Sequence, residues 1–501
     1  MSHLVLAPLL LPLAGGLLPL LIRRGALPLE RAIGVLATLG LVPTAIALVS
    51  QAAGGEVLAY AVGQWPAPFG ITLVLDRLAA WMLLVTAVVA NGALLFALGR
   101  SDTAGRHFHS LFQFQLLGIN GAFLTGDLFN LFVFFEVLLL ASYALLSHGS
   151  SPARTVAAVH VAVVNLLGST LFLVATACIY SAAGSLNFAD LAVRAAALPP
   201  DRLGLWQAGG WMLMVVFALK AAMLPLGFWL PGAYGAADGA VAALFSVLTK
   251  VGVVSIIRVG TVVFPDLDPG PVVWFAAIAT LVLGVTGMLS ASRLSHLAAH
   301  AVIVSVGMLM VAVALFDRAG LAAATYYVAH GTLATAMLFL VAARIAVVRG
   351  ETADLLEAGP EFRGRVALPA AYLLAAIAVA GLPPLGGFLA KLAILDAVLD
   401  GGRAAATFAV VLTATLLSIV SLARAGSTVF WKVGPARGET VELPAWRPAA
   451  VSGVALLLAG LVGLVVYAGP AYEYADAAAG QLLDPGRYVD AVLQGRSGGG
   501  Q

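Results

Sequence analysis

Long apolar runs recur along this sequence, and they limit the chain to a membrane fold. A helix rises 1.5 Å per residue, so about 20 apolar residues cross about 30 Å of hydrocarbon. Fourteen runs approach or exceed this length, and they span 4–22, 32–52, 77–99, 108–126, 127–147, 156–183, 206–230, 240–264, 271–290, 294–316, 321–348, 366–399, 405–424 and 446–468. Because 61% of the 501 residues are hydrophobic and 10% are charged, we expect an all-α polytopic membrane protein. The first run precedes Arg23 and Arg24 rather than following a basic segment, so we expect it to be retained as a helix.

Basic residues are divided unequally between the two sets of alternate loops. One set holds fifteen: Arg23, Arg24, Arg31, Arg100, Arg106, Arg154, Arg293, Arg344, Arg349, Arg363, Arg365, Arg424, Lys432, Arg437 and Arg447. The other set, with the C-terminal tail, holds seven: Arg77, Arg194, Arg202, Arg318, Arg403, Arg487 and Arg496. Cytoplasmic loops carry the excess of basic residues, so both termini are predicted to face outward from a bacterial inner membrane. No basic block indicates a nucleic-acid partner.

Two similar proline motifs occupy corresponding places in the series of runs. Pro225-Leu-Gly-Phe-Trp-Leu230 lies in the seventh run and Pro384-Leu-Gly-Gly-Phe-Leu389 in the twelfth. These runs are the fourth members of two successive five-helix sets, helices 4–8 and 9–13, which must cross the membrane in opposite senses. Interrupted helices within inverted repeats are typical of ion pathways, so we expect breaks at Pro225 and at Pro383-Pro384. The predicted divisions are helices 1–3 (1–107), a first repeat (108–264), a second, inverted repeat (265–431), and a last helix with an external tail (432–501).

Three of the four lysines, Lys220, Lys250 and Lys391, lie inside apolar runs, whereas most of the twenty-two arginines lie in loops. A charged side chain at the centre of a membrane helix costs about 2.5–3.5 kcal/mol. Lysine can lose its proton when buried, whereas arginine stays charged. The distribution therefore indicates lysines placed to exchange protons.

Glu136 is the glutamate within a predicted span, nine residues after Asp127 and about 13 Å along the helix axis. At this depth it is expected to face Lys220. His330, in the eleventh run, is a candidate relay between lysines, although a packed, hydrogen-bonded histidine is an equal alternative. Buried pairs can also be purely structural and fix helix register. Arg258 is expected to extend toward the outer interface.

Four motifs, in order, resemble those of the antiporter-like subunits found in Mrp-type cation/proton antiporters and in the membrane arm of respiratory complex I. The motifs are Gly126-Asp-Leu-Phe-Asn-Leu-Phe-Val-Phe-Phe-Glu136, Phe217-Ala-Leu-Lys-Ala-Ala-Met-Leu-Pro-Leu-Gly-Phe-Trp-Leu-Pro231, Ala240-Val-Ala-Ala-Leu-Phe-Ser-Val-Leu-Thr-Lys-Val-Gly252 and Gly381-Leu-Pro-Pro-Leu-Gly-Gly-Phe-Leu-Ala-Lys391. The chain most resembles the D subunit of Mrp/Pha-type multisubunit Na⁺(K⁺)/H⁺ antiporters.

This resemblance implies a role for each matched residue. Glu136 and Lys220 would form a coupling pair, Lys250 would carry the proton centrally, and Lys391 would end the half-channel in helix 12. The broken helices would supply polar backbone to a water-filled path. Many relatives have a lysine where this chain has Ala334, which places more weight on His330.

The sequence thus predicts a proton-translocating subunit of a monovalent cation (Na⁺ or K⁺)/proton antiporter, working with other subunits in a hetero-oligomer. It would be a transporter and not an enzyme. One cysteine, Cys178, excludes a cysteine-ligated cluster within the chain, and no cofactor is expected. Two alternatives stay open: a proton-pumping subunit of a complex I-like or hydrogenase-type redox complex, and a scaffold subunit that transports nothing.

Overall fold

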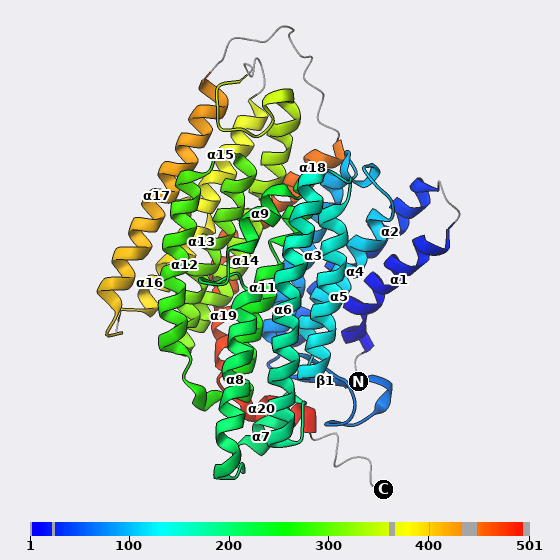
Figure 1. Cartoon of the computed structure of the whole chain (residues 1–501), viewed down its shortest axis with the longest axis vertical. Coiled ribbons are helices and arrows are strands. Elements are labelled where there is room, and N and C mark those ends of the chain that lie inside the picture. Colours follow the sequence, from blue (N-terminus) through cyan, green and yellow to red (C-terminus); the bar gives the residue numbers. More distant parts are fainter. Residues whose placement is uncertain (1–2, 23–25, 360–365, 400, 433–447, 494–501) are drawn as a thin grey trace.

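A computed structural model describes residues 3–22, 26–359, 366–399, 401–432 and 448–493 as a helical bundle with a small hairpin at one end (Figure 1). The helices of the first half are α1 (Ala7–Leu21), α2 (Leu27–Ala53), α3 (Arg77–Ala97), α4 (Phe108–Leu124), α5 (Leu128–Ser147), α6 (Pro152–Ala183), α7 (Phe188–Ala195), α8 (Pro200–Lys220), α9 (Trp229–Ala236), α10 (Gly239–Phe245) and α11 (Leu248–Arg258). Those of the second half are α12 (Gly270–Ser290), α13 (Leu294–Val313), α14 (Arg318–Val348), α15 (Ala367–Ala380), α16 (Gly386–Ala397), α17 (Ala404–Trp431), α18 (Pro448–Val466), α19 (Ala468–Leu482) and α20 (Pro485–Leu493). The hairpin pairs β1 (Leu58–Ala61) with β2 (Thr72–Leu75) in antiparallel register. Short helical turns are η1 (His3–Leu6), η2 (Val62–Gln64), η3 (Ser101–Thr103), η4 (Val259–Val263), η5 (Pro265–Leu267) and η6 (Gly350–Thr352).

The fourteen predicted runs each correspond to a helix or a pair of helices. Within the described ranges, twelve helices are long and apolar enough to cross a membrane. The two other runs are 108–126, which forms the 17-residue α4, and 366–399, which divides into α15 and α16. Several basic residues used for orientation lie outside the described residues, namely Arg23, Arg24, Arg363, Arg365, Arg437, Arg447 and Arg496.

Both predicted breaks are present in the fold. The seventh run ends as α8 at Lys220 and resumes as α9 at Trp229, with Pro225 in the gap. The twelfth ends as α15 at Ala380 and resumes as α16 at Gly386, with Pro383-Pro384 in the gap. Proline removes a backbone donor and clashes with the preceding turn, which is the physical reason for interruption at these positions.

The two five-helix sets cross in opposite senses, as predicted. The helix α4, which opens the first set, begins at the end of the bundle that holds Arg100 and Arg293, two residues that line one cavity. The helix α12, which opens the second set, ends there, so the two helices run in opposite directions. The exact boundaries of the four divisions stay a prediction.

Two helices that the sequence did not predict follow the last apolar run. The helix α19 packs against α14 and α3, and α20 packs against α7 and β1. These helices and α7 are too short or too polar to register as membrane spans, so apolar length alone does not reveal them. The segment η1 and the helix α20 both lie at the hairpin end, which places the two ends of the described chain at the same end of the bundle (Figure 1).

Burial divides the helices into an inner and an outer layer. The span of α10 and α11 is fully buried, and α13, α14 and α3 are mostly buried, whereas α1, α2 and α18 bury only about a third of their length. Leucines such as Leu36 on α2 and Leu166 on α6 are exposed and suit a lipid environment. The ionisable residues described next lie in or against the inner layer.

Candidate functional site

Lys220 is the last residue of α8, directly before the first interruption. Its side chain is 5% exposed, and its Nζ donates to Asn165 Oδ1 of α6 at 3.0 Å. The ring of Phe135 lies 5.8 Å from the same Nζ, at cation–π distance. A cavity of about 20 Å³, roughly the room that one water needs, adjoins Lys220 and Asn165. The ammonium is therefore enclosed, hydrogen-bonded and within reach of one water.

Glu136 of α5 is connected to this lysine through α6. Its carboxylate accepts a hydrogen bond from Ser169, which lies four residues, or one turn, after Asn165 on α6. Among the described residues no ion pair joins Glu136 directly to Lys220, so the expected direct contact is absent. The reason is that α6 packs against both α5 and α8 and supplies an intermediate polar side chain to each.

Lys250 of α11 is fully buried and lies beside the helix that carries Lys220. Its Nζ donates to Thr249 Oγ1 at 3.2 Å. Two residues later, a Cβ added at Gly252 would lie 2.5 Å from the backbone nitrogen of Ala221. This glycine lets the α11 backbone touch α8 immediately after Lys220. The structure thus joins Glu136 and Lys220 through side chains of α6 and packs the backbone of α11, which carries Lys250, against α8. We call Glu136, Lys220 and Lys250 the first cluster.

His330 and Lys391 bind the end of a broken helix. His330 Nε2 lies 2.9 Å from the carbonyl of Ala378, and Lys391 Nζ donates to the carbonyl of Ala380 at 2.7 Å. Both carbonyls belong to the last turn of α15, where helix carbonyls lack intrahelical partners and carry the negative end of the dipole. Lys391 also donates to Thr415 Oγ1 at 3.0 Å. We call His330 and Lys391 the second cluster.

The histidine of this cluster has an assigned tautomer. Since a carbonyl only accepts, His330 Nε2 carries the proton that it donates to Ala378. Its Nδ1 is buried and has no hydrogen-bond partner among the described residues, which leaves a lone pair available when the ring is neutral. A cavity of about 10 Å³, near the volume of one water, adjoins His330, Lys391 and Ala334. Ala334, which the sequence analysis singled out, thus faces this cavity.

The five residues predicted for proton transfer therefore form two clusters and not one continuous chain. Within the described part of the protein, no hydrogen bond links Lys250 to His330. The two clusters are linked through helix packing, because α10, which precedes the Lys250 helix α11, packs against α14, which carries His330. A proton crossing between them needs water or a change of side-chain position.

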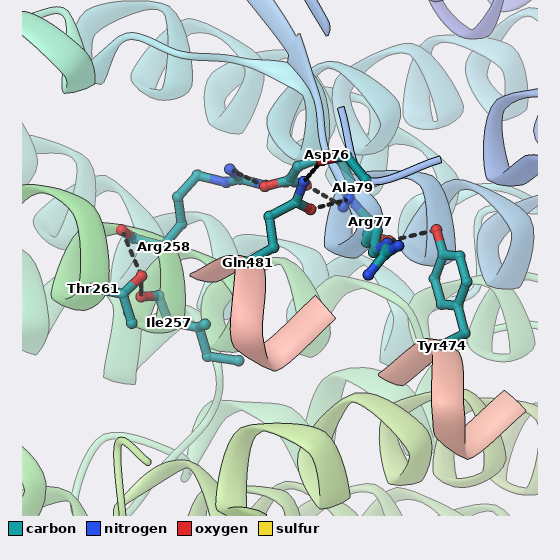
Figure 2. Close-up of polar contacts among 9 residues, drawn as sticks. Asp76, Arg77, Ala79, Ile257, Arg258, Thr261, Tyr474 and Gln481 are labelled. Carbon is teal, nitrogen blue, oxygen red and sulfur yellow. Dashed lines mark hydrogen bonds and ion pairs between the residues drawn. The ribbon is translucent and has the colours of Figure 1, made fainter. Parts of the chain in front are cut away.

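An ion pair fixes the C-terminal end of the helix that carries Lys250. Arg258 donates two hydrogen bonds to the carboxylate of Asp76, at 2.7 and 2.9 Å, and both side chains are buried (Figure 2). The expectation that Arg258 extends to the interface is therefore wrong. Removing one partner of such a pair costs about 3–5 kcal/mol because the other charge stays buried.

The C-terminal helix α19 holds the same region from the other side. Gln481 accepts from the backbone nitrogen of Arg77 at 2.9 Å, and Tyr474 donates to the carbonyl of Arg77 at 3.1 Å (Figure 2). These bonds attach α19 to the first residue of α3, directly after Asp76. The C-terminal region therefore stabilises the start of α3, next to the Asp76 partner of Arg258.

Sequence reasoning missed the neutral partners of the charged residues. Asn165 and Ser169 are a polar pair at helical spacing within an apolar run, and that pattern was the available signal. Thr415 and Asp76 carried no comparable signal. Among the described residues, no group of three or more histidine, cysteine, aspartate or glutamate side chains could hold a metal ion.

The sequence and the fold are similar to those of known antiporter subunits. Residues 125–418 match the family described as NADH:quinone oxidoreductase/Mrp antiporter, transmembrane region. The chain is 39% identical to the D subunit of a probable K⁺/H⁺ antiporter of Rhizobium meliloti, over 100% of this chain and 99% of the relative. It is 35% identical to the D subunit of a Na⁺/H⁺ antiporter of Alkalihalophilus pseudofirmus, over 99% of this chain and 100% of the relative. A chain of the Mrp complex from Dietzia sp. superposes with a TM-score of 0.85 at 28% identity, covering 98% of this chain and 100% of that one.

Proposed function

The chain belongs to the NADH:quinone oxidoreductase/Mrp antiporter transmembrane family, and we propose that its two clusters carry the proton in a multisubunit cation/proton antiporter. It is a multi-pass membrane subunit of such an antiporter, working in a hetero-oligomer with other subunits of the Mrp type. In this role it moves ions and forms no covalent intermediate. The exchanged cation is Na⁺ or K⁺, the two named in its relatives.

The observation that carries this proposal is the pairing of a membrane lysine with each interrupted helix. Lys220 ends α8 at the first interruption, and Lys391 binds the carbonyl that α15 leaves free at the second. Interrupted helices expose polar backbone at membrane depth, which is where transporters bind ions. A buried lysine in such a place can accept and release a proton.

The proposed sequence of steps uses the contacts of both clusters. A proton enters the first cluster and reaches Lys250, while the Glu136–Ser169 and Lys220–Asn165 bonds set how strongly Lys220 holds its charge. Repulsion between charged Lys220 and Lys250 then favours release toward the second cluster. There Nδ1 of His330 receives the proton and Lys391 passes it on.

The energies involved are of matching size. One elementary charge crossing the membrane potential gains about 2.3 kcal/mol per 100 mV. A hydrogen bond to a charged group contributes about 1.5–3 kcal/mol. Exchanging one partner of a lysine is therefore enough to control whether the proton moves.

The proposed setting is a bacterial inner membrane with the arginine-rich loops in the cytoplasm. Both termini then face outward, on the side of the hairpin and α20. Proton entry from outside drives export of the cation through the complex.

The test is cation-dependent dissipation of a pH gradient in everted vesicles from antiporter-deficient cells. The vesicles contain this chain with its partner subunits, as wild type or as Lys220→Ala. The matched control is Lys432→Ala, because Lys432 is the exposed fourth lysine at the end of α17. Native gels verify that the complex assembles.

Loss of exchange in assembled Lys220→Ala, with Lys432→Ala unchanged, supports the proposal. Full exchange in assembled Lys220→Ala contradicts it and favours a scaffold role. If wild-type complex exchanges neither Na⁺ nor K⁺ but acidifies vesicles during electron transfer, the chain is instead part of a redox-driven pump.

A further inference from the structure

A wide cavity of about 750 Å³ opens at the arginine-rich end of the bundle. Its charged lining consists of Arg100, Arg154, Arg293 and Arg344 with Asp238 and Asp354. Four of these charges form two pairs in the cavity wall, Arg154 with Asp238 at 3.7 Å and Arg293 with Asp354 at 2.9 Å. This polar space is large enough for many waters, and it belongs to neither cluster.

One side chain lies between this wide cavity and the small cavity at Lys220. Tyr234 of α9 lines both, and it is the residue common to the two linings within the described chain. Its side chain is 1% exposed, so it fills the space between them. A proton moving from the wide cavity to Lys220 must pass this phenol.

Tyr234 is held in place by one hydrogen bond and three aromatic neighbours. Its hydroxyl donates to the carbonyl of Phe245 at 2.8 Å. The rings of Trp229, Phe245 and Phe339 lie 6.1, 5.5 and 6.2 Å from its own. These contacts come from α9 itself, α10 and α14, so three separate elements fix the phenol.

The helix that carries Tyr234 is a short second half of a broken helix. It has eight residues, and the non-helical residues 221–228 separate it from α8. The regular helical hydrogen bonding of α8 therefore does not continue into α9. It also contacts both halves of the molecule, because it packs against α6 and α13. Trp229, the first residue of α9, donates its indole N–H to the Leu219 carbonyl of α8 at 3.1 Å, so a small rotation of α9 that moves Tyr234 would also be felt next to Lys220.

We propose that Tyr234 is the gate between the wide cavity and Lys220, closed in this structure by its packing and its bond to Phe245. Its part in transport rests on the proposed function, but the closure is measurable without transport. In this arrangement a single side chain, that of Tyr234, separates the wide cavity at the arginine-rich end from the cavity at Lys220.

The experiment measures access of a membrane-impermeant methanethiosulfonate reagent to single cysteines in the assembled complex. Cys178→Ser removes the native thiol. Ser142→Cys reports on the small cavity and Ala346→Cys on the wide one, since these residues line the respective spaces. Reagent is added in turn to everted and right-side-out vesicles, and modification is read on this chain after purification.

With Tyr234 present, we expect the Ala346→Cys reporter to react and the Ser142→Cys reporter to be protected. Tyr234→Ala should speed modification of Ser142→Cys about tenfold or more, equal to about 1.4 kcal/mol, and leave Ala346→Cys unchanged. Tyr234→Phe keeps the ring but loses the bond to Phe245, so its rate should lie between the two. The unchanged Ala346→Cys rate also verifies that the variants fold.

If the Ser142→Cys reporter is modified equally fast with tyrosine and with alanine at position 234, the gate proposal is wrong. It is also wrong if the Ala346→Cys reporter reacts with reagent from neither side of the membrane. If Tyr234→Ala does not assemble, Tyr234→Phe decides between the same outcomes. If Tyr234→Ala speeds labelling of Ser142→Cys while Lys220→Ala leaves cation exchange unchanged, the gate is supported and the proposed function is contradicted. The two proposals can therefore fail independently.

Discussion

The two interrupted helices hold their lysines in different ways. Lys220 precedes its interruption and depends on the side chain of Asn165, while the neighbouring carbonyl of Leu219 accepts from the Trp229 indole at 3.1 Å. Lys391 follows its interruption and reaches back to the backbone carbonyl of Ala380. At the first interruption the helix-end carbonyl of Leu219 thus accepts from an indole and from the backbone of Ala222, whereas at the second the helix-end carbonyl of Ala380 accepts from the lysine.

This difference indicates different tasks. A lysine bound by another side chain can be adjusted when that side chain moves, so the first cluster suits a switch linked to Glu136 through α6. A lysine bound by a helix carbonyl has a fixed partner, so the second cluster suits a constant proton acceptor. The two sequence motifs are too similar to reveal this difference.

The largest expected effect tests the packing of the interruptions. A Cβ at Gly227, in the first, would lie 2.2 Å from the backbone oxygen of Ala222. One at Gly387, in the second, would lie 2.4 Å from the side chain of His330 and 2.9 Å from the Cα of Gly381. Backbone atoms cannot move away by changing rotamer, as a side chain can. Gly227→Ala should therefore lower the free energy of unfolding by about 3 kcal/mol and strongly lower the melting temperature of the purified complex. Gly387→Ala should melt nearer to wild type but lose exchange, because His330 must turn away from Ala378.

The matched control for this pair is Gly232→Ala. Gly232 lies in α9 with nothing within 4 Å of an added Cβ, so alanine there should be neutral or stabilising. If Gly387→Ala lowers melting as much as Gly227→Ala, the second interruption is as rigid as the first and the comparison fails.

An intermediate effect tests the two lysine partners. Asn165→Ala removes the side chain that accepts from Lys220 and should cost about 2 kcal/mol, which slows cation-dependent exchange roughly tenfold or more. Thr415→Val removes one of two acceptors of Lys391 and keeps shape, so exchange should fall less. Both are measured in everted vesicles at equal assembly, and a larger loss for Thr415→Val would reverse the assignment of switch and fixed acceptor.

The smallest effect comes from making the first interruption resemble the second. Trp229→Phe removes the indole donor from the carbonyl of Leu219 at a cost of about 1 kcal/mol. The carbonyl keeps its backbone donor, Ala222, and its second lone pair becomes available to Lys220. In combination with Asn165→Ala, it should restore part of the lost exchange, because Lys220 gains a backbone acceptor. A double-mutant cycle measures this coupling, and strictly additive losses would show that Lys220 cannot reach the carbonyl.

Much of this architecture was predictable because membrane physics leaves few choices. The apolar runs, the prolines at both breaks and the depth of the three lysines follow from hydrocarbon thickness and from the cost of burying charge. The candidate proton-transfer residues Glu136, Lys220, Lys250, His330 and Lys391 were named from residue type and position. Their roles in transport are still proposals that the experiments above decide.

What each of these residues contacts was decided by tertiary structure. Apolar periodicity reports that a helix exists but not which helix it meets, so the sequence paired Glu136 with Lys220, whereas in the fold each of them hydrogen-bonds to a different side chain of α6. Likewise Arg258 binds Asp76, 182 positions away, and Lys391 binds a carbonyl whose availability depends on where α15 stops. The sequence by itself determined the membrane class, the helix order and the ionisable residues, because burial of charge and apolar length are local properties. Pairing, cavities and the position of Tyr234 arise from packing between distant segments, which no local property encodes.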